Sequence, residues 1–246
     1  MDTYIYDNLY ISVVIPAHNE AENLPGLIQE IDENLSPWTR GYEIIVIDDH
    51  STDDSITVLQ EIKKRYPNLR VYRHKSRLGQ SAGVYSGVEV ARYPIVVTLD
   101  GDGQNPPSEI PKLVEELVKD KSLSMVVGWR KKRSDNIVKR ISSRVANLVR
   151  NLLLKDGIRD SGCGLKAFYK KDFLSLPCIN HMHRFLPFMF QMLGKKVKQI
   201  EVNHRPRKSG KGHYTTIARA IVGIIDIAGM LYLKHRYIPE RKKEEI

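Results

Sequence analysis

The sequence predicts an α/β protein: a single Rossmann-like domain with a mostly parallel central sheet, helices on both faces, and an amphipathic C-terminal helix. Short β-branched runs alternate with segments of helical periodicity, which is the cadence of β-α-β units joined by right-handed crossovers. A chain of 246 residues can bury one full hydrophobic core. One domain with a short appendage fits this length better than two domains.

Four strands and four helices are expected in the first half. The strands are short, apolar and rich in β-branched residues, and they are expected at 11–15, 42–47, 70–72 and 95–99. The helices are expected at 22–35, from a cap at 52–53 to about 62, at 81–91, and after the proline pair 106–107. Thr52 or Asp53 can cap the second of these helices.

The second half is less regular. Strands are expected at 125–127 and 197–202, a short strand after the turn at 160–164, and a helix from 181 onward. Between them, basic residues that include Arg140, Arg144 and Arg150 share a helix with an apolar stripe. This combination is typical of an amphipathic element that faces lipid or an anionic tail. The exposed face of an ordinary soluble helix gives the same pattern.

Charge is distributed very unevenly along the chain. Residues 1–120 contain 11 Lys and Arg against 20 Asp and Glu, whereas residues 121–246 contain 28 against 9. The first half therefore cannot present a surface for a polyanion, whereas the second half either meets an anionic partner or carries its self-repulsion unaided. Nucleic acid, anionic lipid and a phosphorylated substrate all qualify as such a partner.

Acidic residues follow three of the predicted strands. They are Glu20 after the first strand, Asp48 and Asp49 after the second, and Asp100 and Asp102 after the fourth. Each alone fits a turn or a helix cap. Together they line one edge of a parallel sheet, the edge where open α/β sheets bind ligands, and this is costly without a cation or a hydrogen-bonding ligand. Asp100 and Asp102 could hold a hard divalent cation against a pyrophosphate.

Several other classes lack support. No G-x-G-x-x-G follows a strand and no G-x-x-x-x-G-K-[ST] occurs, so dinucleotide and P-loop chemistry are not indicated. Cys163 and Cys178 are too few for a disulfide scaffold, so reduced thiols in a cytosolic compartment are expected. The acids and tyrosines of residues 1–10 do not resemble a signal peptide.

The last helix, expected at 217–233, is the most apolar segment. Its mostly apolar stretch runs only from Ala220 to Leu233, whereas a helix that crosses a bilayer needs about 20 such residues. Basic residues follow at 234–236 and 241–243. This arrangement predicts an interfacial helix with a polybasic flank on an anionic membrane surface. Burial against the domain's own core is the alternative.

Five segments carry a family resemblance: Val14–Leu24, Ile47–Asp53, Leu99–Pro106, Gly128–Arg130 and Asp160–Gly164. In this order they resemble family 2 glycosyltransferases of the dolichyl-phosphate mannose synthase type, and the bacterial polyprenyl-phosphate relatives look most similar. The resemblance implies a GT-A fold at 1–214, with a nucleotide-binding half at about 1–120 and an acceptor-binding half at about 121–214. Residues 215–246 would form the membrane-interface helix and a basic tail.

The resemblance also implies substrates and site residues. The donor would be a nucleotide-diphosphate-sugar, UDP- or GDP-linked, and the acceptor a polyprenyl phosphate of undecaprenyl or dolichyl type. The nucleotide would be bound by Pro16, His18, Glu20, Ile47, Asp49, Gly101, Arg207 and Lys211, with Asp49 near the base. Mg²⁺ or Mn²⁺ would be bound by Asp100, Asp102 and Gln104, and the acceptor phosphate by Arg130, Arg140 and Ser143. Catalysis would depend on Asp100, Asp102 and Arg130.

One position departs from the family pattern. Basic residues are frequent in the loop expected at 204–214 after the last strand, called the basic loop here. The family usually has a lysine before the tyrosine of this loop, where this chain has His213. Either Lys211 takes over that contact or the loop depends on pH.

The implied reaction is an inverting displacement at the anomeric carbon of the sugar. A phosphate acceptor is already ionised and needs no general base, but cations must relieve the repulsion between two anionic substrates. The expected location is the cytoplasmic face of a membrane, peripheral or monotopic. One alternative is a family 2 enzyme with a soluble or saccharide acceptor. A remote one is a basic nucleic-acid-binding module, which the acidic strand ends disfavour, so no nucleic-acid partner is expected.

Overall fold

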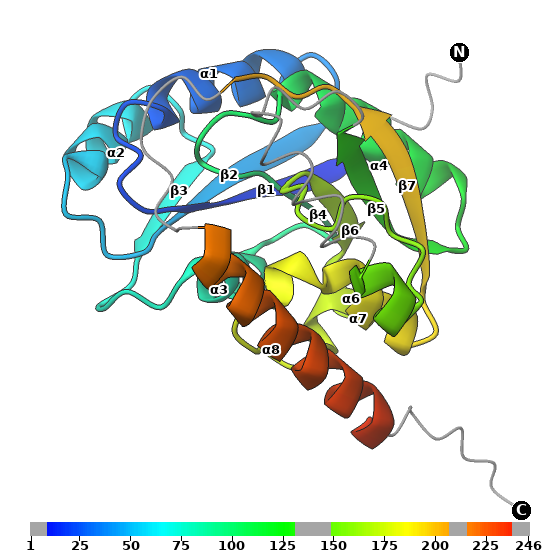
Figure 1. Cartoon of the computed structure of the whole chain (residues 1–246). Helices are drawn as coiled ribbons and strands as arrows, with labels where there is room; N and C mark the ends of the chain where they lie inside the picture. The colour runs from blue at the N-terminus through cyan, green and yellow to red at the C-terminus, as the bar shows by residue number, and fades with distance from the viewer. Residues whose placement is uncertain (1–8, 131–148, 207–215, 238–246) are drawn as a thin grey trace, which may run out of the picture.

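A seven-stranded sheet in the order β3-β2-β1-β4-β6-β5-β7 forms the centre of the molecule (Figure 1). The structure, a computed structural model, describes residues 9–130, 149–206 and 216–237. The strands are β1 (Tyr10–Ala17), β2 (Gly41–Asp48), β3 (Leu69–Arg73), β4 (Ile95–Thr98), β5 (Leu123–Arg130), β6 (Lys166–Tyr169) and β7 (Lys196–Val202). β6 runs antiparallel to β4 and β5, and the other pairings are parallel. The predicted mostly parallel sheet is confirmed.

Helices cover both faces of this sheet (Figure 1). One face packs against α1 (Leu24–Leu35), α2 (Ser55–Lys63) and α4 (Ile110–Lys119), which follows the 3₁₀ turn η2 (Pro107–Glu109). The other face packs against α3 (Gln80–Val90), α6 (Lys170–Leu174), α7 (Leu186–Met192) and α8 (Thr216–Arg236). A further 3₁₀ turn, η3 (Met182–Arg184), leads into α7.

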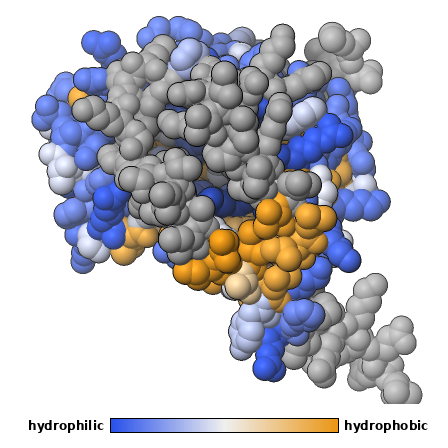
Figure 2. Space-filling view, in the orientation of Figure 1, coloured by the Kyte–Doolittle hydropathy of each residue, from blue (hydrophilic) through white to orange (hydrophobic). Residues whose placement is uncertain are grey.

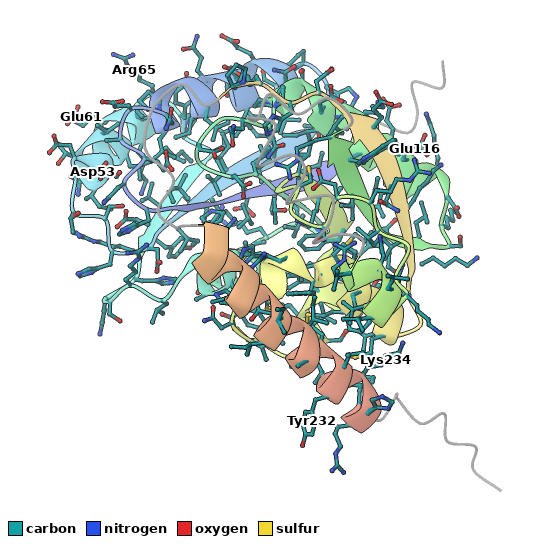
Figure 3. The ribbon with its side chains drawn as sticks, viewed as in Figure 1. Asp53, Glu61, Arg65, Glu116, Tyr232 and Lys234 are labelled. Carbon is teal, nitrogen blue, oxygen red and sulfur yellow. The ribbon has the colours of Figure 1, made fainter. Side chains whose placement is uncertain are left out.

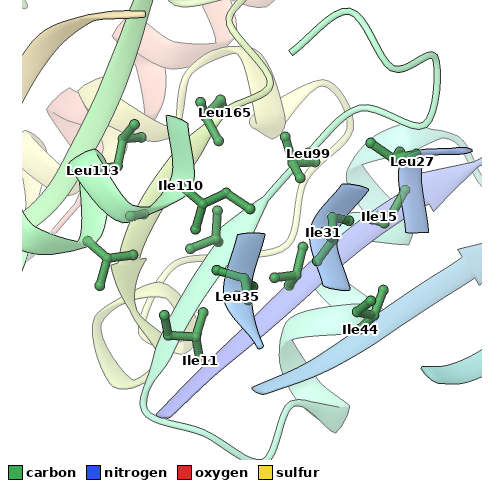
Figure 4. Close-up of a cluster of buried hydrophobic side chains, with 14 of the residues drawn as sticks. Ile11, Ile15, Leu27, Ile31, Leu35, Ile44, Leu99, Ile110, Leu113 and Leu165 are labelled. Atoms are coloured by element: carbon green, nitrogen blue, oxygen red, sulfur yellow. The ribbon is translucent and has the colours of Figure 1, made fainter. Parts of the chain in front are cut away.

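Strand alternation divides the core into two clusters. Ile11, Val13 and Ile15 of β1 point into the cluster beneath α1 and α4, part of which Figure 4 shows, whereas Val14 points into the cluster beneath α3. Successive side chains of a strand face opposite sides, so a strand buried on both faces needs an unbroken apolar run. This is why β1, β2 and β4 could be predicted from composition alone.

The parallel register brings three strand ends together. Ala17 pairs with Asp48 and Val14 with Thr98, so the loops that follow β2, β1 and β4 leave the sheet side by side. Asp49 N–H donates to Ala17 O at 2.8 Å, and Leu99 N–H donates to Val14 O at 3.1 Å. The acidic residues of these loops therefore meet at one edge of the sheet.

The structure refines the predicted helix starts. Asp54 occupies the N-cap position of α2, but it makes no capping hydrogen bond through its side chain. The carboxylate of Asp53 instead accepts hydrogen bonds from Ser55 N at 3.1 Å and Ser55 Oγ at 2.6 Å, so Asp53 rather than Thr52 caps the helix. Helix α1 begins at Leu24, two residues later than predicted.

The prediction for the 139–150 helix is wrong at Arg150. Residues 149–154 are helical, but the Arg150 side chain is buried. It pairs with Asp156 at 3.5 Å and also donates to the carbonyl of Ile158. Leu152 and Leu153 are exposed instead. The arginine of residues 149–154 thus points inward and the two leucines point outward, because the buried Asp156 supplies a counter-charge. Helical periodicity within the segment could not predict this, since Asp156 lies beyond it.

Helix α8 both packs on the domain and exposes apolar side chains. Ile227 and Met230 are buried against the cluster beneath α3 and α7. Asp226 accepts a hydrogen bond from His181 Nδ1 at 2.9 Å, which fixes the helix to the turn before α7. Ile224 and Ile225 are about two-thirds exposed. Within the described residues, no helix combines the length and apolarity needed to span a membrane.

Candidate active site

A cavity of about 310 Å³ opens beside the carboxyl ends of β1 and β4. Its wall includes Pro16 from β1, Asp100 after β4, Lys166 from β6, and the turn at 161–164. The predicted motifs at 14–24, 99–106 and 160–164 therefore meet at one place.

The Asp100 carboxylate is held in a tight, buried position. Gln80 Nε2 donates to Asp100 Oδ1 at 2.8 Å. A Cβ at Gly164 would overlap the Asp100 carboxylate, so only glycine fits there. Burial raises the pKa of Asp100, and the neighbouring charge of Asp102 raises it further. Two neighbouring carboxylates repel each other unless a cation lies between them.

Asp102 belongs to a tight loop that Arg205 clamps. The loop turns at Gly103, which has φ +67°, and Asp102 Oδ1 accepts a hydrogen bond from Gln104 N at 3.1 Å. Arg205 donates through Nε to Gly103 O at 2.5 Å and through its backbone N–H to Gln104 O at 3.0 Å. Arg205 also pairs with Glu30 of α1 at 2.8 Å. This clamp was not predicted, because the sequence shows Arg205 only as one of several cations in a basic loop.

Asp100 and Asp102 suit a hard divalent cation whose other ligands are supplied mostly by water and by the substrate. Neither carboxylate makes an ion pair with a described lysine, arginine or histidine, so both charges remain available. No cluster of three or more His, Cys, Asp or Glu side chains in the described ranges is placed to hold a metal. The side-chain amide of Gln104 makes no hydrogen bond to a described residue. Mg²⁺ and Mn²⁺ suit such an oxygen-donor set, since Mg²⁺ is usually bound by one or two carboxylates plus substrate phosphates.

Asp49 organises the loop before α3. Its Oδ1 accepts hydrogen bonds from His74 Nδ1 and Leu78 N, both at 2.8 Å, and its Oδ2 accepts one from Gly79 N at 2.7 Å. Burial acts to raise the pKa of Asp49, but these hydrogen bonds outweigh it and lower the pKa. The carboxylate is thus ionised and holds Gly79 at φ +90°, where α3 begins. His18 Nδ1 lies 2.9 Å from Asp49 O, which joins the loops after β1 and β2.

The other expected nucleotide-binding residues lie around the same edge. Glu20 Oε2 accepts a hydrogen bond from Asn23 Nδ2 at 2.6 Å, and Gly101 lies against the Glu20 side chain and the Pro16 carbonyl. The Ile47 side chain is fully buried in the cluster beneath α3, so it packs below the ligand-binding edge of the sheet. The structure brings all five residues of the first half together with Gly101. Arg207, Lys211 and His213 lie outside the described residues, as do Arg140 and Ser143.

Arg130 lies at the end of β5 and is bound by Asp160 through both carboxylate oxygens. Nε to Oδ2 is 2.7 Å and Nη2 to Oδ1 is 2.9 Å, and the two side chains are 9% and 6% exposed. Burial acts to lower the pKa of Arg130, but the paired Asp160 carboxylate raises it overall. Its remaining nitrogen, Nη1, lies 3.5 Å from His204 Nε2. Arg130 is thus a fixed cation.

The anionic and cationic parts of the site share one loop. A Cβ at Gly162 would lie 3.5 Å from Arg130 Nη2, and two residues later Gly164 touches Asp100. The charges of Asp100 and Arg130 also influence each other's pKa. The carboxylate pair and Arg130 therefore lie on the same side of the molecule, as the sequence argument requires.

Several residues that line the cavity were not predicted as site residues, among them Lys166 and His183. Lys166 is buried in the cavity wall, and the sequence showed it only as the start of a short strand. His183 also lines the cavity, with Ser81 Oγ 2.7 Å from its Nδ1. Burial lowers the pKa of His183 to about 3, and the nearby charges of Lys166 and Arg184 contribute. The H-x-H spacing of His181 and His183 did not indicate that His183 lines a cavity.

Residues 12–176 match the glycosyl transferase family 2 profile. The chain belongs to this family. It is 28% identical over 229 residues to the dodecaprenyl-phosphate galacturonate synthase of Rhizobium johnstonii, covering 92% of this chain and 67% of the relative. It is 32% identical over 208 residues to the undecaprenyl-phosphate 4-deoxy-4-formamido-L-arabinose transferase of Pseudomonas aeruginosa, covering 84% of this chain and 61% of the relative. The chain thus spans about two thirds of the length of these curated relatives or slightly less.

The fold of this family 2 chain is that of solved GT-A glycosyltransferases. The glucosyl-3-phosphoglycerate synthase of Mycobacterium tuberculosis, crystallised with Mn²⁺, UDP and phosphoglyceric acid, superposes with a TM-score of 0.70 at 20% identity, covering 95% of this chain and 80% of that one. The mannosyl-3-phosphoglycerate synthase of Rubrobacter xylanophilus gives a TM-score of 0.69 at 16% identity, covering 95% and 77%. The predicted GT-A fold and family are confirmed.

Proposed function

We propose that this family 2 chain transfers a sugar, with inversion and with a divalent cation, from a nucleotide-diphosphate-sugar to a polyprenyl phosphate. The first half would hold the donor and the second half the acceptor. The observation that carries the proposal is the contact of Asp100 and Arg130 with one loop, which sets a site for a cation beside a fixed guanidinium. Both curated relatives described above bear names of polyprenyl-phosphate sugar transferases or synthases, which supports this acceptor class.

The chemistry of the cavity favours an acceptor that is already ionised. A hydroxyl acceptor needs a general base near the anomeric carbon. Among the described residues that line the cavity, Asp100 is the one carboxylate, and it is assigned to the cation. Asp160 is bound by Arg130 through both oxygens, and a histidine with a pKa of about 3 is a weak base. A phosphate acceptor needs no proton removed.

Each part of the site would have one role in this reaction. The cation would neutralise the leaving diphosphate, which is the chemistry that such a group supplies when it is bound. Asp100 and Asp102 would hold the cation, and the clamp of Arg205 keeps their loop in shape. Arg130, oriented by Asp160, would place a positive charge where the acceptor phosphate approaches. The Asp49 loop would hold the nucleoside.

Exposed apolar side chains would hold the enzyme at a membrane surface, where a polyprenyl acceptor is found. Figure 2 shows hydrophobic surface gathered where α8 and the helix at 149–154 lie. The exposed apolar residues of these helices are Val149, Leu152, Leu153, Ile224 and Ile225, each at least 40% exposed, and the exposed aromatic Tyr232 follows near the end of α8. Figure 3 shows Tyr232 projecting from α8 away from the domain. Peripheral attachment at the cytoplasmic face follows from this proposal.

A thermal-shift panel tests the donor half of the proposal. The melting temperatures measured with UDP and with GDP, each with and without Mn²⁺, should differ clearly, because a ligand that binds only the folded state raises the melting temperature. One nucleotide should stabilise the protein, and only with the cation. Stabilisation by neither nucleotide would contradict the proposal.

A transfer assay with undecaprenyl phosphate tests the acceptor half. Asp102→Ala should abolish transfer while the melting temperature stays within about 2 °C of wild type. Asp120→Ala is the matched control, because Asp120 Oδ1 accepts a hydrogen bond from Ser122 N two residues on, as Asp102 does from Gln104, but lies far from the cavity. Normal transfer by Asp102→Ala would remove the cation role. Transfer to a soluble saccharide instead of the lipid would establish the alternative acceptor class.

A further inference from the structure

Lys166 is a buried lysine without a carboxylate partner. The residue is 3% exposed, and no carboxylate among the described side chains lies within ion-pair distance of Nζ. Its amine donates a hydrogen bond to the carbonyl of Cys163, which leaves two of its three N–H donors for other partners. Burial lowers the pKa of Lys166. The charges of Asp100 and Asp160 act on Lys166 from beyond ion-pair distance, and burial outweighs them. A ligand that brings a negative charge next to the amine would therefore bind there favourably.

The cavity wall has a net positive character on this side. Lys166 and Arg184 supply positive charges and Asp100 supplies a negative one, which a bound divalent cation would neutralise. His183 is neutral at pH 7 because its pKa is about 3. Arg184 also lines the cavity; its side chain is 39% exposed and pairs with Asp226 at 3.6 Å, near the upper limit for an ion pair.

We propose that this cavity contains an anion-binding subsite, in which Lys166 and Arg184 bind an anionic group of a substrate, a carboxylate or a phosphate. The inference rests on the proposed function, because it assigns a substrate group to the same active site. The subsite is separate from Arg130, whose Nε and Nη2 are occupied by Asp160. It adds a recognition element that neither the carboxylate pair nor Arg130 provides.

Two sources can supply the anionic group. One is a carboxylate on the donor sugar, as in a nucleotide-linked hexuronate. The other is the phosphate of the polyprenyl acceptor. The two sources differ in which substrate loses affinity when the lysine charge is removed, so one set of variants distinguishes them.

The central variant is Lys166→Met, which keeps the length of the side chain and removes its charge. Lys166→Arg is the conservative variant and should restore binding. Lys170→Met is the matched control, because Lys170 Nζ also donates to backbone carbonyls, of Glu89 at 3.0 Å and Ala91 at 2.6 Å, but does not line the cavity. Arg184→Gln provides a second, independent test, since its partly exposed side chain can be changed without disturbing the core.

The donor arm uses calorimetry with Mn²⁺ and a pair of donors that differ only in a carboxylate. The pair is UDP-glucuronate and UDP-glucose, or GDP-mannuronate and GDP-mannose if the nucleotide panel selects guanosine. A sugar carboxylate in the subsite predicts that wild type binds the uronate at least about tenfold more tightly, the scale of a charge-assisted hydrogen bond. Lys166→Met should lose that preference and keep its affinity for the neutral sugar.

The acceptor arm uses steady-state transfer to undecaprenyl phosphate. A phosphate in the subsite predicts equal binding of the two donors, and a KM for undecaprenyl phosphate raised at least about tenfold in Lys166→Met. Inorganic phosphate should then compete with the lipid in wild type but not in the variant.

If folded Lys166→Met and Arg184→Gln both match wild type and Lys170→Met in donor preference and in KM, the subsite is refuted while the transfer reaction stands. If wild type binds neither UDP nor GDP in the presence of Mn²⁺, the proposed function fails, and the subsite fails with it. A circular dichroism spectrum and a melting curve for each variant establish that the proteins compared are folded.

Discussion

At the scale of single residues, the site depends on how closely Gly164 approaches Asp100. The backbone of Gly164 is fixed from both sides, since Thr98 Oγ1 donates to its carbonyl at 2.7 Å. The Asp100 carboxylate occupies the space that any Cβ at this position would need. The close approach of the Gly164 backbone therefore fixes the orientation of the Asp100 carboxylate.

Gly164→Ala should therefore push the Asp100 carboxylate out of its position. We expect at least a tenfold loss of affinity for Mn²⁺ with nucleotide diphosphate, because two well-placed carboxylates are needed to bind a divalent cation in this set. Isothermal titration with Mn²⁺ and the preferred nucleotide measures this. Gly26→Ala is the control: a Cβ there has no neighbour within 4 Å, and in helix α1 the change should stabilise the fold by about 0.5–1 kcal/mol. Equal affinity in the two variants would show that Gly164 does not position Asp100.

His183 should make the fold sensitive to acid. Its pKa is about 3 in the folded protein and about 6.5 in the unfolded chain, so the unfolded state binds the proton first as the pH falls. The stability that neutral His183 contributes is fully present above about pH 6.5 and is lost progressively between pH 6.5 and 3. In that window the free energy of unfolding should fall by up to about 1.4 kcal/mol per pH unit from this group.

His183→Asn removes the titrating group, and the variant should show a shallower decline. Urea unfolding of both proteins at intervals between pH 7 and 4.5 gives the two slopes. Parallel slopes would mean that His183 titrates normally and that the wall of the cavity near Ser81 is open to water.

At the scale of elements, the loop after β4 is held by the segment that follows β7. The Arg205 side chain binds the Gly103 carbonyl and the Glu30 carboxylate of α1, and its backbone N–H donates to the Gln104 carbonyl, so one residue joins three parts of the chain. The predicted basic loop therefore contains a residue with a structural role, besides Arg207 and Lys211, which are expected to bind the nucleotide.

Arg205→Gln should loosen the loop that carries Asp102. We expect the KM for the donor to rise about tenfold while the melting temperature changes by less than about 4 °C, since the lost contacts lie at the surface. Lys112→Gln is the control, because Lys112 Nζ likewise joins an α4 residue to a carbonyl, of Glu201, at 2.5 Å, but far from the carboxylate pair. A donor KM unchanged in Arg205→Gln would show that the loop holds its shape without the clamp.

Sequence patterns predicted the elements that depend on local composition. Buried strands such as β1 and β4 need unbroken apolar runs, and the loops after them could be placed because parallel strands end at one edge. Contacts between distant segments could not be predicted in this way. Arg150 was expected on an exposed face directed toward lipid, an anionic tail or solvent, and only the fold shows that it is buried against Asp156. Lys166 and Arg205 gain their roles from neighbours up to about a hundred residues away.

At the scale of the whole molecule, the uneven charge of the chain has a spatial meaning. The acidic first half forms β1–β4, and the basic second half supplies β5, β6, β7 and the C-terminal helix. The two halves lie side by side in one sheet and meet where β4 pairs with β6. The carboxylate edge and the cationic residues thus meet near the middle of the sheet instead of at opposite ends of the molecule.

The exposed face of α8 should decide whether the protein binds membranes. Ile224 and Ile225 are 67% and 65% exposed, whereas Ile227 and Met230 on the other side of the helix are buried, so the exposed pair can be changed without unfolding the helix. Burying one isoleucine in an apolar phase is worth about 1.5–3 kcal/mol.

The double variant Ile224→Asp, Ile225→Asp should lose at least about tenfold in partitioning to vesicles of phosphatidylglycerol and phosphatidylethanolamine, measured by sedimentation at low salt. Tyr72→Asp, which adds a negative charge on the edge strand β3, should partition like wild type within about twofold. The double variant should also keep its affinity for nucleotide and cation, because the carboxylate pair does not depend on this face. Equal partitioning of the double variant and wild type would place membrane attachment elsewhere on the chain.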